Sequence, residues 1–388
     1  MKEESIIEAV YPEMVQWRRY LHQYPELSFQ ETKTSQWIFD RLRQWGIEAE
    51  KGRRGNQVTA TIYGDQPGPT VALRADMDAL PIQEQNQVPY ASKVPGVMHA
   101  CGHDAHTAIL LAAAKILHQH RHRLKGKVRL LFQHAEEICP GGALTVIDEG
   151  GLDDVDVIYG IHLWTPLPLG TVATRAGAFM ASVDEFHIEV KGKGGHGGLP
   201  HEAVDSIVIA SHLVVNLQSI VSRTVDPIES CVISVGSMKA GDSFNAIAEM
   251  CHMNGTVRTF NASIRKKVNR QIERIAHHTA SMFGAEAKVD YEWGYPPLMN
   301  DRHEVERVLR IGAKLFGEDR IRSDMMVMAA EDFAYYLQKV PGCFFFIGAG
   351  LQPDPVPHHH PAFDIDERAM KHALNMFLSL VDDYMNRP

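Results

Sequence analysis

Apolar residues follow two patterns in the first part of the chain and near its end. Some segments carry them at helical spacing, whereas others are short continuous apolar runs, typical of strands buried on both faces. The helical pattern covers residues 6–24, 31–45 and 105–119, and the apolar runs cover residues 57–63, 70–74, 128–132, 155–161 and 343–347. Helices alternating with buried strands predict an α/β fold, with a mostly parallel sheet flanked by helices.

The middle of the chain has another pattern. Residues 182–190 alternate between apolar and polar, as expected of a strand with one buried face. The elements that follow are predicted as a helix at 203–221, strands at 231–235 and within 246–258, a helix at 264–283 and a strand at 287–293. The order β-α-β-β-α-β predicts a ferredoxin-like domain. We expect this domain, residues 181–293, to be inserted into a discontinuous catalytic domain of residues 1–180 and 294–388.

Composition and charge narrow the function classes. The chain has 388 residues, enough for two domains. A net charge of -9 argues against a nucleic-acid surface, which carries clustered positive charge. The chain shows no unbroken apolar run of about 18 residues and begins with charged residues, so we expect neither a membrane partner nor a secretory signal. Five widely spaced cysteines predict reduced thiols and a cytoplasmic location.

The densest group of chemically active side chains is the sequence His99-Ala100-Cys101-Gly102-His103-Asp104. A thiolate and imidazoles together are typical ligands of zinc and similar metals. The other candidate donors are Asp76, Asp78, Glu136, Glu137, His162 and the triplet His358–His360. Each follows the C-terminal end of a predicted strand, the edge at which α/β sheets build their sites. Together these donors predict a two-metal hydrolase centre.

The adjacent glutamates Glu136 and Glu137 suggest two different roles. Neighbouring carboxylates repel each other, and a metal bound by one of them relieves that repulsion. The other carboxylate is then available as a general base. A solvated acidic turn is the alternative, which the preceding apolar strand and the other donors disfavour.

The remaining donors in this half of the chain allow more than one interpretation. A glycine-containing loop is able to turn both Cys101 and His103 toward one ion, and a thiolate is able to bridge two ions. An isolated histidine such as His162 is often a core side chain, but its spacing from the glutamates favours a ligand. One of Asp76 and Asp78 orients a ligand from behind or caps a helix.

The inserted domain holds three further candidates. His196 lies in the glycine-rich loop 192–198, which lacks the spacing of a phosphate-binding loop. This histidine either donates to a developing oxyanion or belongs to a simple turn. Asn245 and Arg258 suit carboxylate recognition, since a guanidinium binds a carboxylate with two parallel hydrogen bonds. A surface salt bridge is the alternative for Arg258.

Seven segments, found in order through both domains, carry a family resemblance. They are residues 73–81, 98–106, 135–137, 194–197, 255–258, 330–333 and 359–361. With them the chain resembles the metal-dependent aminoacylase/carboxypeptidase superfamily, in its branch of hippurate hydrolases and auxin-conjugate (IAA-amino acid) amidohydrolases. The resemblance implies a dinuclear-metallopeptidase-like catalytic domain and an inserted ferredoxin-like lid that also forms a dimer.

The resemblance also implies a role for each matched residue. The implied metal ligands are Cys101, His103, Glu137, His162 and His359, with Cys101 bridging two ions. Glu136 would be the general base and then the proton donor to the leaving amine. His196, contributed by the partner subunit, would stabilise the tetrahedral intermediate, and Asn245 and Arg258 would hold the substrate's α-carboxylate. We expect Asp78 to orient a ligand from behind.

The chain departs from the family pattern at three places. It has His134 where the family often has proline, and His358 where a leucine usually precedes the C-terminal ligand. His359 takes the ligand position because it lies two residues before Pro361. The segment around Asn245 lacks a proline that is common there.

We therefore expect a cytoplasmic metallohydrolase that cleaves N-acyl-L-amino acids to a carboxylic acid and a free amino acid. Two divalent ions per subunit are expected, zinc first, with manganese, cobalt or nickel as alternatives. We expect a homodimer or a higher homo-oligomer formed through the lid domain. A dipeptidase or carboxypeptidase with the same centre is the enzymatic alternative. A non-catalytic metal-binding or ligand-binding relative is the other, which the presence of every candidate ligand disfavours.

Overall fold

The computed structural model describes residues 3–351 and 353–386 and divides the chain into two compact units. The first comprises Met1–Phe179, Met299–Met326 and Asp332–Pro388, and the second comprises Met180–Leu298 and Val327–Glu331. The chain leaves the second unit at Leu298, a few residues later than expected. The short segment Val327–Glu331 also joins the second unit, because the Ala181 backbone N–H donates to the carbonyls of Val327 and Ala329. Part of the charged start of the chain, residues 1–2, lies outside the described residues.

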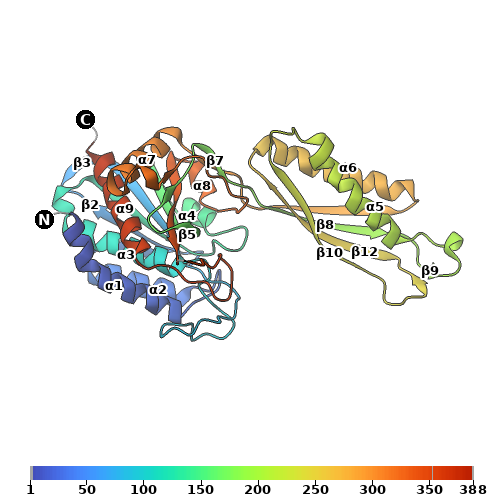
Figure 1. The fold of residues 1–388 in the computed structure, drawn as a ribbon, viewed down its shortest axis with the longest axis horizontal. Coiled ribbons are helices and arrows are strands. Elements are labelled where there is room, and N and C mark those ends of the chain that lie inside the picture. The colour runs from blue at the N-terminus through green and yellow to red at the C-terminus, as the bar shows by residue number, and fades with distance from the viewer. Residues whose placement is uncertain (1–2, 352, 387–388) are drawn as a thin grey trace. The chain divides into compact units, whose positions relative to one another are not determined.

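The first unit is built on an eight-stranded sheet in the order β1-β2-β4-β3-β5-β16-β6-β15 (Figure 1). Its central strands β4, β3, β5 and β16 are parallel to one another. The strands are β1 Glu48–Lys51, β2 Val58–Tyr63, β3 Gln66–Asp76, β4 Lys125–Gln133, β5 Val157–Pro168, β6 Val172–Ala173, β15 Ile321–Arg322 and β16 Gly342–Gly350. Residues 71–76 of β3 and all of β16 are buried, which explains their unbroken apolar runs. The predicted mostly parallel α/β fold is confirmed.

Helices cover this sheet. They are α1 Glu3–Gln23, α2 Thr32–Gln44, α3 His103–Gln119, α4 Ala143–Asp148, α7 Arg302–Phe316, α8 Ala334–Leu337 and α9 Ala369–Met385, with short 3-10 turns at Arg121–Arg123 and Glu318–Arg320. Nearly every residue of α3 is buried, and α3 packs between α1, α9 and the sheet. Alternate residues of β3, Val71, Leu73 and Ala75, belong to this helix-facing core. A small pair of strands, β7 Gly177–Met180 and β14 Leu298–Asn300, lies where the chain passes between the units.

The second unit has the predicted β-α-β-β-α-β order. Its antiparallel strands β8 Asp184–Lys191, β10 Cys231–Ala240, β12 Met250–Thr259 and β13 Glu286–Trp293 form a sheet in the order β10-β12-β8-β13. Helices α5 Ser206–Ser219 and α6 Ala262–Met282 pack on one face of this sheet (Figure 1). A π turn, Ile220–Thr224, extends α5; a 3-10 turn, Pro200–Glu202, and the paired strands β9 Gly195–His196 and β11 Ala246–Ile247 complete the unit. The role of this unit as a lid or dimerisation domain stays a prediction.

One helical segment of the second unit is long and apolar on average, although it holds no unbroken apolar run of about 18 residues. Among the described residues, the helical segment 206–224 is long and apolar enough, by length and composition, to cross a membrane. Polar residues interrupt this segment, but its average hydropathy stays high enough for a membrane span. Ile209, Leu213 and Leu217 on this segment are buried in the core of the second unit, while 28% of its 18-residue window is buried as a whole.

A buried ionic cluster connects α1 to the start of α3. The guanidinium of Arg18 is fully buried and donates to Asp104 at 2.9 Å, to Asp364 at 2.7 Å and to Glu367 at 3.1 Å. His22 Nδ1 lies 2.8 Å from the same Asp104 oxygen. Burial opposes ionisation of Asp104, but Arg18 and His22 outweigh it and hold the pKa of its carboxyl well below the usual range. The cluster therefore fixes the first turn of α3.

Replacement of Arg18 by methionine removes the charge while it keeps much of the side-chain volume. We expect Arg18→Met to lower the free energy of unfolding by about 3–5 kcal/mol, because it leaves a buried carboxylate without its main partner. Arg19 is the matched control, since it contacts the same Glu367 but its side chain is 46% exposed. Arg19→Met should cost less than about 1 kcal/mol. Equal losses in denaturant titrations of the two variants would contradict this account of the cluster.

Candidate metal centre

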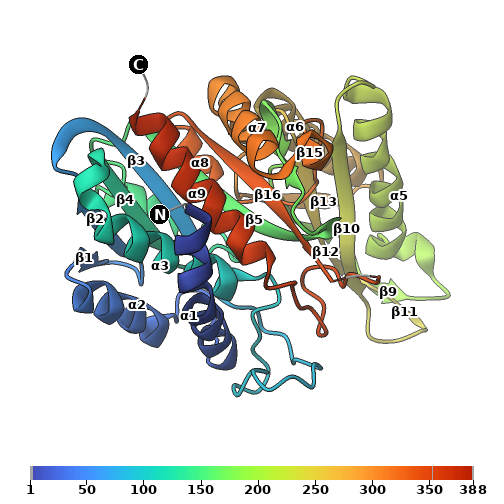
Figure 2. The ribbon, with the colours of Figure 1, turned by 60° about the vertical axis from the view of Figure 1, so that its left-hand side comes forward.

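The candidate donors lie at the carboxyl ends of four adjacent parallel strands, β4, β3, β5 and β16 (Figure 2). Asp76 ends β3, and Glu136 and Glu137 follow the end of β4. His162 lies within β5 rather than after it, because β5 continues to Pro168 along β16. The segment that holds the histidine triplet follows β16. Since the strands are parallel, these donors converge on one edge of the sheet.

Cys101 and His103 come together through a sharp turn. Gly102 has a φ of 90°, in the left-handed region that favours glycine, and directly precedes α3. The sequence predicts His103 in a loop, but His103 is the first residue of α3. Both side chains are buried.

The His103 ring leaves one nitrogen available for a metal. Its Nδ1 lies 3.0 Å from the Asp78 carbonyl oxygen and 3.2 Å from Asp78 Oδ1, so this nitrogen carries the proton and donates it. The buried Nε2 has no hydrogen-bond partner and lies 3.7 Å from Glu137 Oε1, which is also buried and without a hydrogen-bond partner. Two buried lone-pair atoms that face each other suit a cation bound to both.

Asp78 holds the two residues in place. Its Oδ1 contacts His103, while its Oδ2 accepts from the Glu137 backbone N–H at 3.0 Å and from Ser28 Oγ at 2.7 Å. The carboxylate thus lies behind both His103 and Glu137, where an orienting residue is needed.

The Cys101 sulfur belongs to two groups of donors. In one, His162 Nε2 lies 3.3 Å and His358 Nδ1 lies 3.8 Å from the sulfur. In the other, Cys101 is grouped with Glu137 and His359, and His359 Nε2 lies 3.3 Å from Glu137 Oε2. The His162 Nδ1–H donates to the Leu163 carbonyl at 2.8 Å, which leaves Nε2 as the available lone pair. His162, Glu137 and His359 thus share donor groups with the Cys101 sulfur, while His103 reaches the cluster through Glu137.

The electrostatics of the cluster suit a bound cation. Burial, followed by the Glu137 and Glu136 carboxylates, raises the pKa of the Cys101 thiol well above its ordinary value. Burial disfavours the charged form of His103, but neighbouring carboxylates, led by Asp76, outweigh it and raise its pKa to about 10. A divalent ion would offset this excess of negative charge and favour the thiolate. The chemistry of the donor set thus fits a divalent metal.

Glu136 occupies the expected place beside the ligands. It is buried, and its carboxylate forms one donor group with the Glu137 carboxylate and the His103 ring. The preceding Ala135 has a φ of 50°, and its backbone N–H donates to Glu31 Oε1 at 2.8 Å. Burial raises the pKa of Glu31 to about 7. Sequence reasoning missed Glu31, since nothing in its own segment indicates contact with the glutamate turn.

Another buried network beside the centre was also missed. Arg74 donates to Asp76 at 2.6 Å and to Asp332 at 2.9 Å, and Gln133 donates to the same Asp332. An arginine inside an apolar strand was the available signal, because a fully buried charge needs a partner. His106 lies nearby but accepts from the Leu163 backbone N–H through Nε2 and contacts Asp76 through Nδ1, so neither nitrogen is available for a metal.

The three candidates of the second unit separate into two places. His196 on β9 and Asn245 are exposed and adjacent, since the Gly197 backbone N–H donates to the Asn245 carbonyl at 2.8 Å. They lie beyond the end of the sheet at which Met250 of β12 pairs with Lys191. Arg258 lies eight residues after Met250 along β12. At about 3.3 Å per residue, it is about 26 Å from that end of the sheet. One copy of the chain therefore does not bring Asn245 and Arg258 to the same carboxylate.

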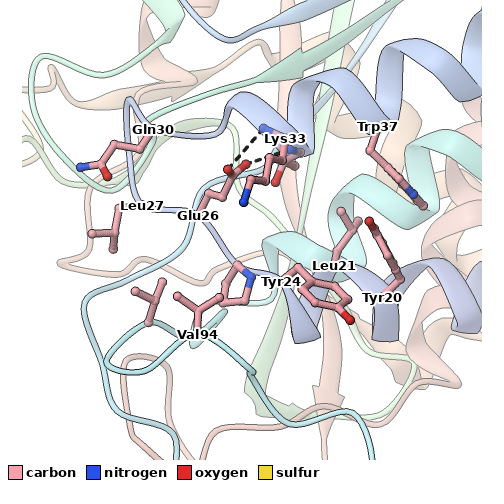
Figure 3. Close-up of a pocket in the computed structure, with 12 residues that line it drawn as sticks. Tyr20, Leu21, Tyr24, Glu26, Leu27, Gln30, Lys33, Trp37 and Val94 are labelled. Atoms are coloured by element: carbon pink, nitrogen blue, oxygen red, sulfur yellow. Dashed lines mark hydrogen bonds between the residues drawn. The ribbon is translucent and has the colours of Figure 1, made fainter.

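The donor cluster does not line the surface pocket drawn in Figure 3. That pocket, of about 330 Å³, lies between α1, α2 and the segment around Val94. Tyr20 and Trp37 stack in it at 5.0 Å, and Glu26 accepts from the backbone N–H of Thr34 at 2.8 Å. None of the candidate metal donors lines this pocket.

Cys, His and Glu donors at the carboxyl edge of a parallel sheet define a metal-dependent hydrolase. Residues 72–383 match the peptidase family M20/M25/M40. An N-acyl-L-amino acid amidohydrolase of Geobacillus stearothermophilus is 47% identical and covers 77% of this chain and 81% of its own length. An N-acetyl-L-cysteine deacetylase of Bacillus subtilis is 43% identical over 95% of this chain and 88% of its own length. The crystal structure of the Bacillus subtilis protein YXEP, described as a dinuclear metal binding peptidase from the M20 family, superimposes with a TM-score of 0.84 at 38% identity, covering 97% of this chain and 99% of that one. The chain therefore belongs to peptidase family M20/M25/M40.

Removal of the shared thiol should reduce metal binding. We expect Cys101→Ala to lose at least one divalent ion per chain, because its sulfur belongs to both donor groups. Cys343→Ala is the matched control, since that thiol is also buried but contacts Thr174 and no candidate donor. Elemental analysis after dialysis measures the metal content of both variants. Full metal content in Cys101→Ala would exclude the sulfur as a ligand.

Proposed function

We propose that the protein is a metal-dependent amidohydrolase that cleaves N-acyl-L-amino acids to a carboxylic acid and a free amino acid. The observation that carries this proposal is the buried donor cluster with a second glutamate, Glu136, beside the candidate ligand Glu137. The names of the two relatives, an amidohydrolase and a deacetylase of N-acyl amino acids, support the same reaction class.

The proposed cofactor is a pair of divalent ions. Cys101, His103, Glu137, His162 and His359 would hold them, and the Cys101 sulfur belongs to two of the candidate donor groups. Such ions would polarise the amide carbonyl and lower the pKa of a water molecule in the site. Zinc suits the thiolate and imidazole donors best, and manganese, cobalt and nickel are the alternatives.

The protein's own groups would then handle the proton and the charges. Glu136 would accept the proton from the attacking water and deliver it to the leaving nitrogen. His196 would donate a hydrogen bond to the oxyanion of the tetrahedral intermediate. Asn245 and Arg258 would bind the α-carboxylate of the amino-acid half of the substrate.

The two adjacent glutamates allow a direct test of their separate roles. We expect Glu136→Gln to lower turnover by roughly 10²–10⁴-fold, because it removes proton transfer, while the metal content stays unchanged. Glu137→Gln should instead lose metal. Elemental analysis and the release of free amino acid from N-acetyl and N-benzoyl amino acids measure the two effects. Near-normal turnover by Glu136→Gln would show that another group is the base.

The same substrate panel separates the alternatives. Chelation by EDTA should abolish release from the acylated substrates. Faster cleavage of peptides with a free α-amine would favour a dipeptidase or carboxypeptidase. Bound metal with no turnover of either substrate class would favour a non-catalytic relative.

We further propose that the working site needs two copies of the chain. The separation of Arg258 from His196 and Asn245 within the second unit supports this, since one small substrate cannot reach both ends of its sheet. The exposed apolar side chains Ile207, Val208 and Val215 on α5 suit a homodimer contact through this unit. We also propose a cytoplasmic location, which the five cysteines support, since none of them is in a disulfide among the described residues.

Subunit complementation tests the shared site. His196→Ala and Arg258→Ala should each be nearly inactive alone. Co-refolding or co-expression of the two should restore about one quarter of wild-type activity, because half of the randomly formed C2 dimers would contain one intact site of two. No recovery, with mixed dimers shown by mass spectrometry, would contradict a site completed by the partner.

A further inference from the structure

His358 differs from the other histidines of the centre in how its two nitrogens are used. Its Nε2 lies 3.3 Å from the backbone nitrogen of Thr165, while its Nδ1 lies 3.8 Å from the Cys101 sulfur. The backbone of Cys101 also lies near this ring. His358 is thus close enough to the thiol to be mistaken for a metal ligand.

The partner of Nε2 decides which nitrogen carries the proton. A backbone N–H is only a donor, so Nε2 of His358 must accept the hydrogen bond from Thr165. In the neutral ring the proton is then on Nδ1, which faces the sulfur. His103 and His162 have the opposite arrangement, because their Nδ1–H groups donate to carbonyl oxygens and leave Nε2 for a metal.

β5 and its neighbours hold the His358 ring in this orientation. The ring lies against Trp164, with centroids 4.6 Å apart, and Trp164 stacks on Phe346 at 4.3 Å. The Thr165 hydroxyl donates to the Val356 carbonyl at 2.8 Å and so anchors the segment that precedes His358. Strand β5 therefore presents the candidate ligand His162 and, two and three residues later, the residues that position His358.

We propose that His358 is a positioning residue that donates an Nδ1–H···S hydrogen bond to the Cys101 thiolate and is not itself a metal ligand. This inference rests on the proposed metal centre, with Cys101 as a ligand. A hydrogen bond to a metal-bound sulfur withdraws electron density from it and fixes its orientation. Donation from the sulfur to the metal would be weaker than with the leucine that usually occupies this position in the resembling family, since leucine has no donor.

Cobalt substitution of the full-length protein makes the sulfur bond visible, because cobalt(II) thiolates absorb in the near ultraviolet through sulfur-to-metal charge transfer. We expect His358→Leu to keep the wild-type number of cobalt ions but to shift this band to longer wavelength, as the sulfur becomes a better electron donor. His358→Asn places an amide N–H near the position of Nδ1 and should restore the wild-type band. His359→Leu, the neighbouring control, should lose cobalt.

Three outcomes would overturn the inference or its basis. Loss of an ion from His358→Leu would make His358 a ligand. Full cobalt content with an unshifted band in His358→Leu would remove the hydrogen bond from the account. Absence of any sulfur-to-cobalt band in the wild-type protein would instead contradict Cys101 as a ligand, and with it the proposed metal centre itself.

Discussion

The burial of one thiol among carboxylates is the constraint on which the centre depends. Cys101 is enclosed with Glu136, Glu137 and Asp76 nearby, and each of these groups disfavours a thiolate in the absence of a cation. Such a concentration of negative charge is costly in a protein interior unless positive charge balances it. A pair of divalent ions would provide that balance, and the Nδ1 hydrogen bonds of His103 and His162 direct the Nε2 atoms of both rings toward the donor cluster.

The fold meets this constraint by placing rigid elements behind each donor. The parallel strands bring their carboxyl ends to one edge, and Gly102 turns the chain so that Cys101 and His103 face the same place. Buried ion pairs then fix the supports, with Arg18 holding the start of α3 through Asp104. Glu31 holds the turn before Glu136 by accepting the Ala135 N–H. These supporting residues orient the donors but do not themselves contact a metal in the proposed centre.

Much of this arrangement was predictable from the sequence because burial on both faces leaves a clear apolar signal. The central strands and α3 fall close to their predicted ranges, and the expected ligands lie at one edge of the sheet. The extension of β5 past His162 was not predictable, because pairing with β16 rather than composition decides it. Helices α7 and α9 were not among the predicted elements, although both bury an apolar face. Arg74 and Asp332 are 258 residues apart, so their contact has no local signal.

The sequence spacing of Asn245 and Arg258 already implies that they lie apart. Most of the twelve residues between them form the extended strand β12, which holds its two ends far apart. A motif that places both residues on one carboxylate thus already requires a second copy of the chain or a different role for one of them. The positions of Asn245 and Arg258 along the strand therefore limit how a substrate site is assembled.

The most direct test of the central claim is a crystal structure of the metal-loaded protein, with anomalous scattering measured at the metal absorption edge. We expect two ions per chain, both within about 2.3 Å of the Cys101 sulfur if the metal is zinc. A single ion, or two ions of which neither contacts that sulfur, would contradict the claim that the buried thiolate is the shared ligand around which the centre is built.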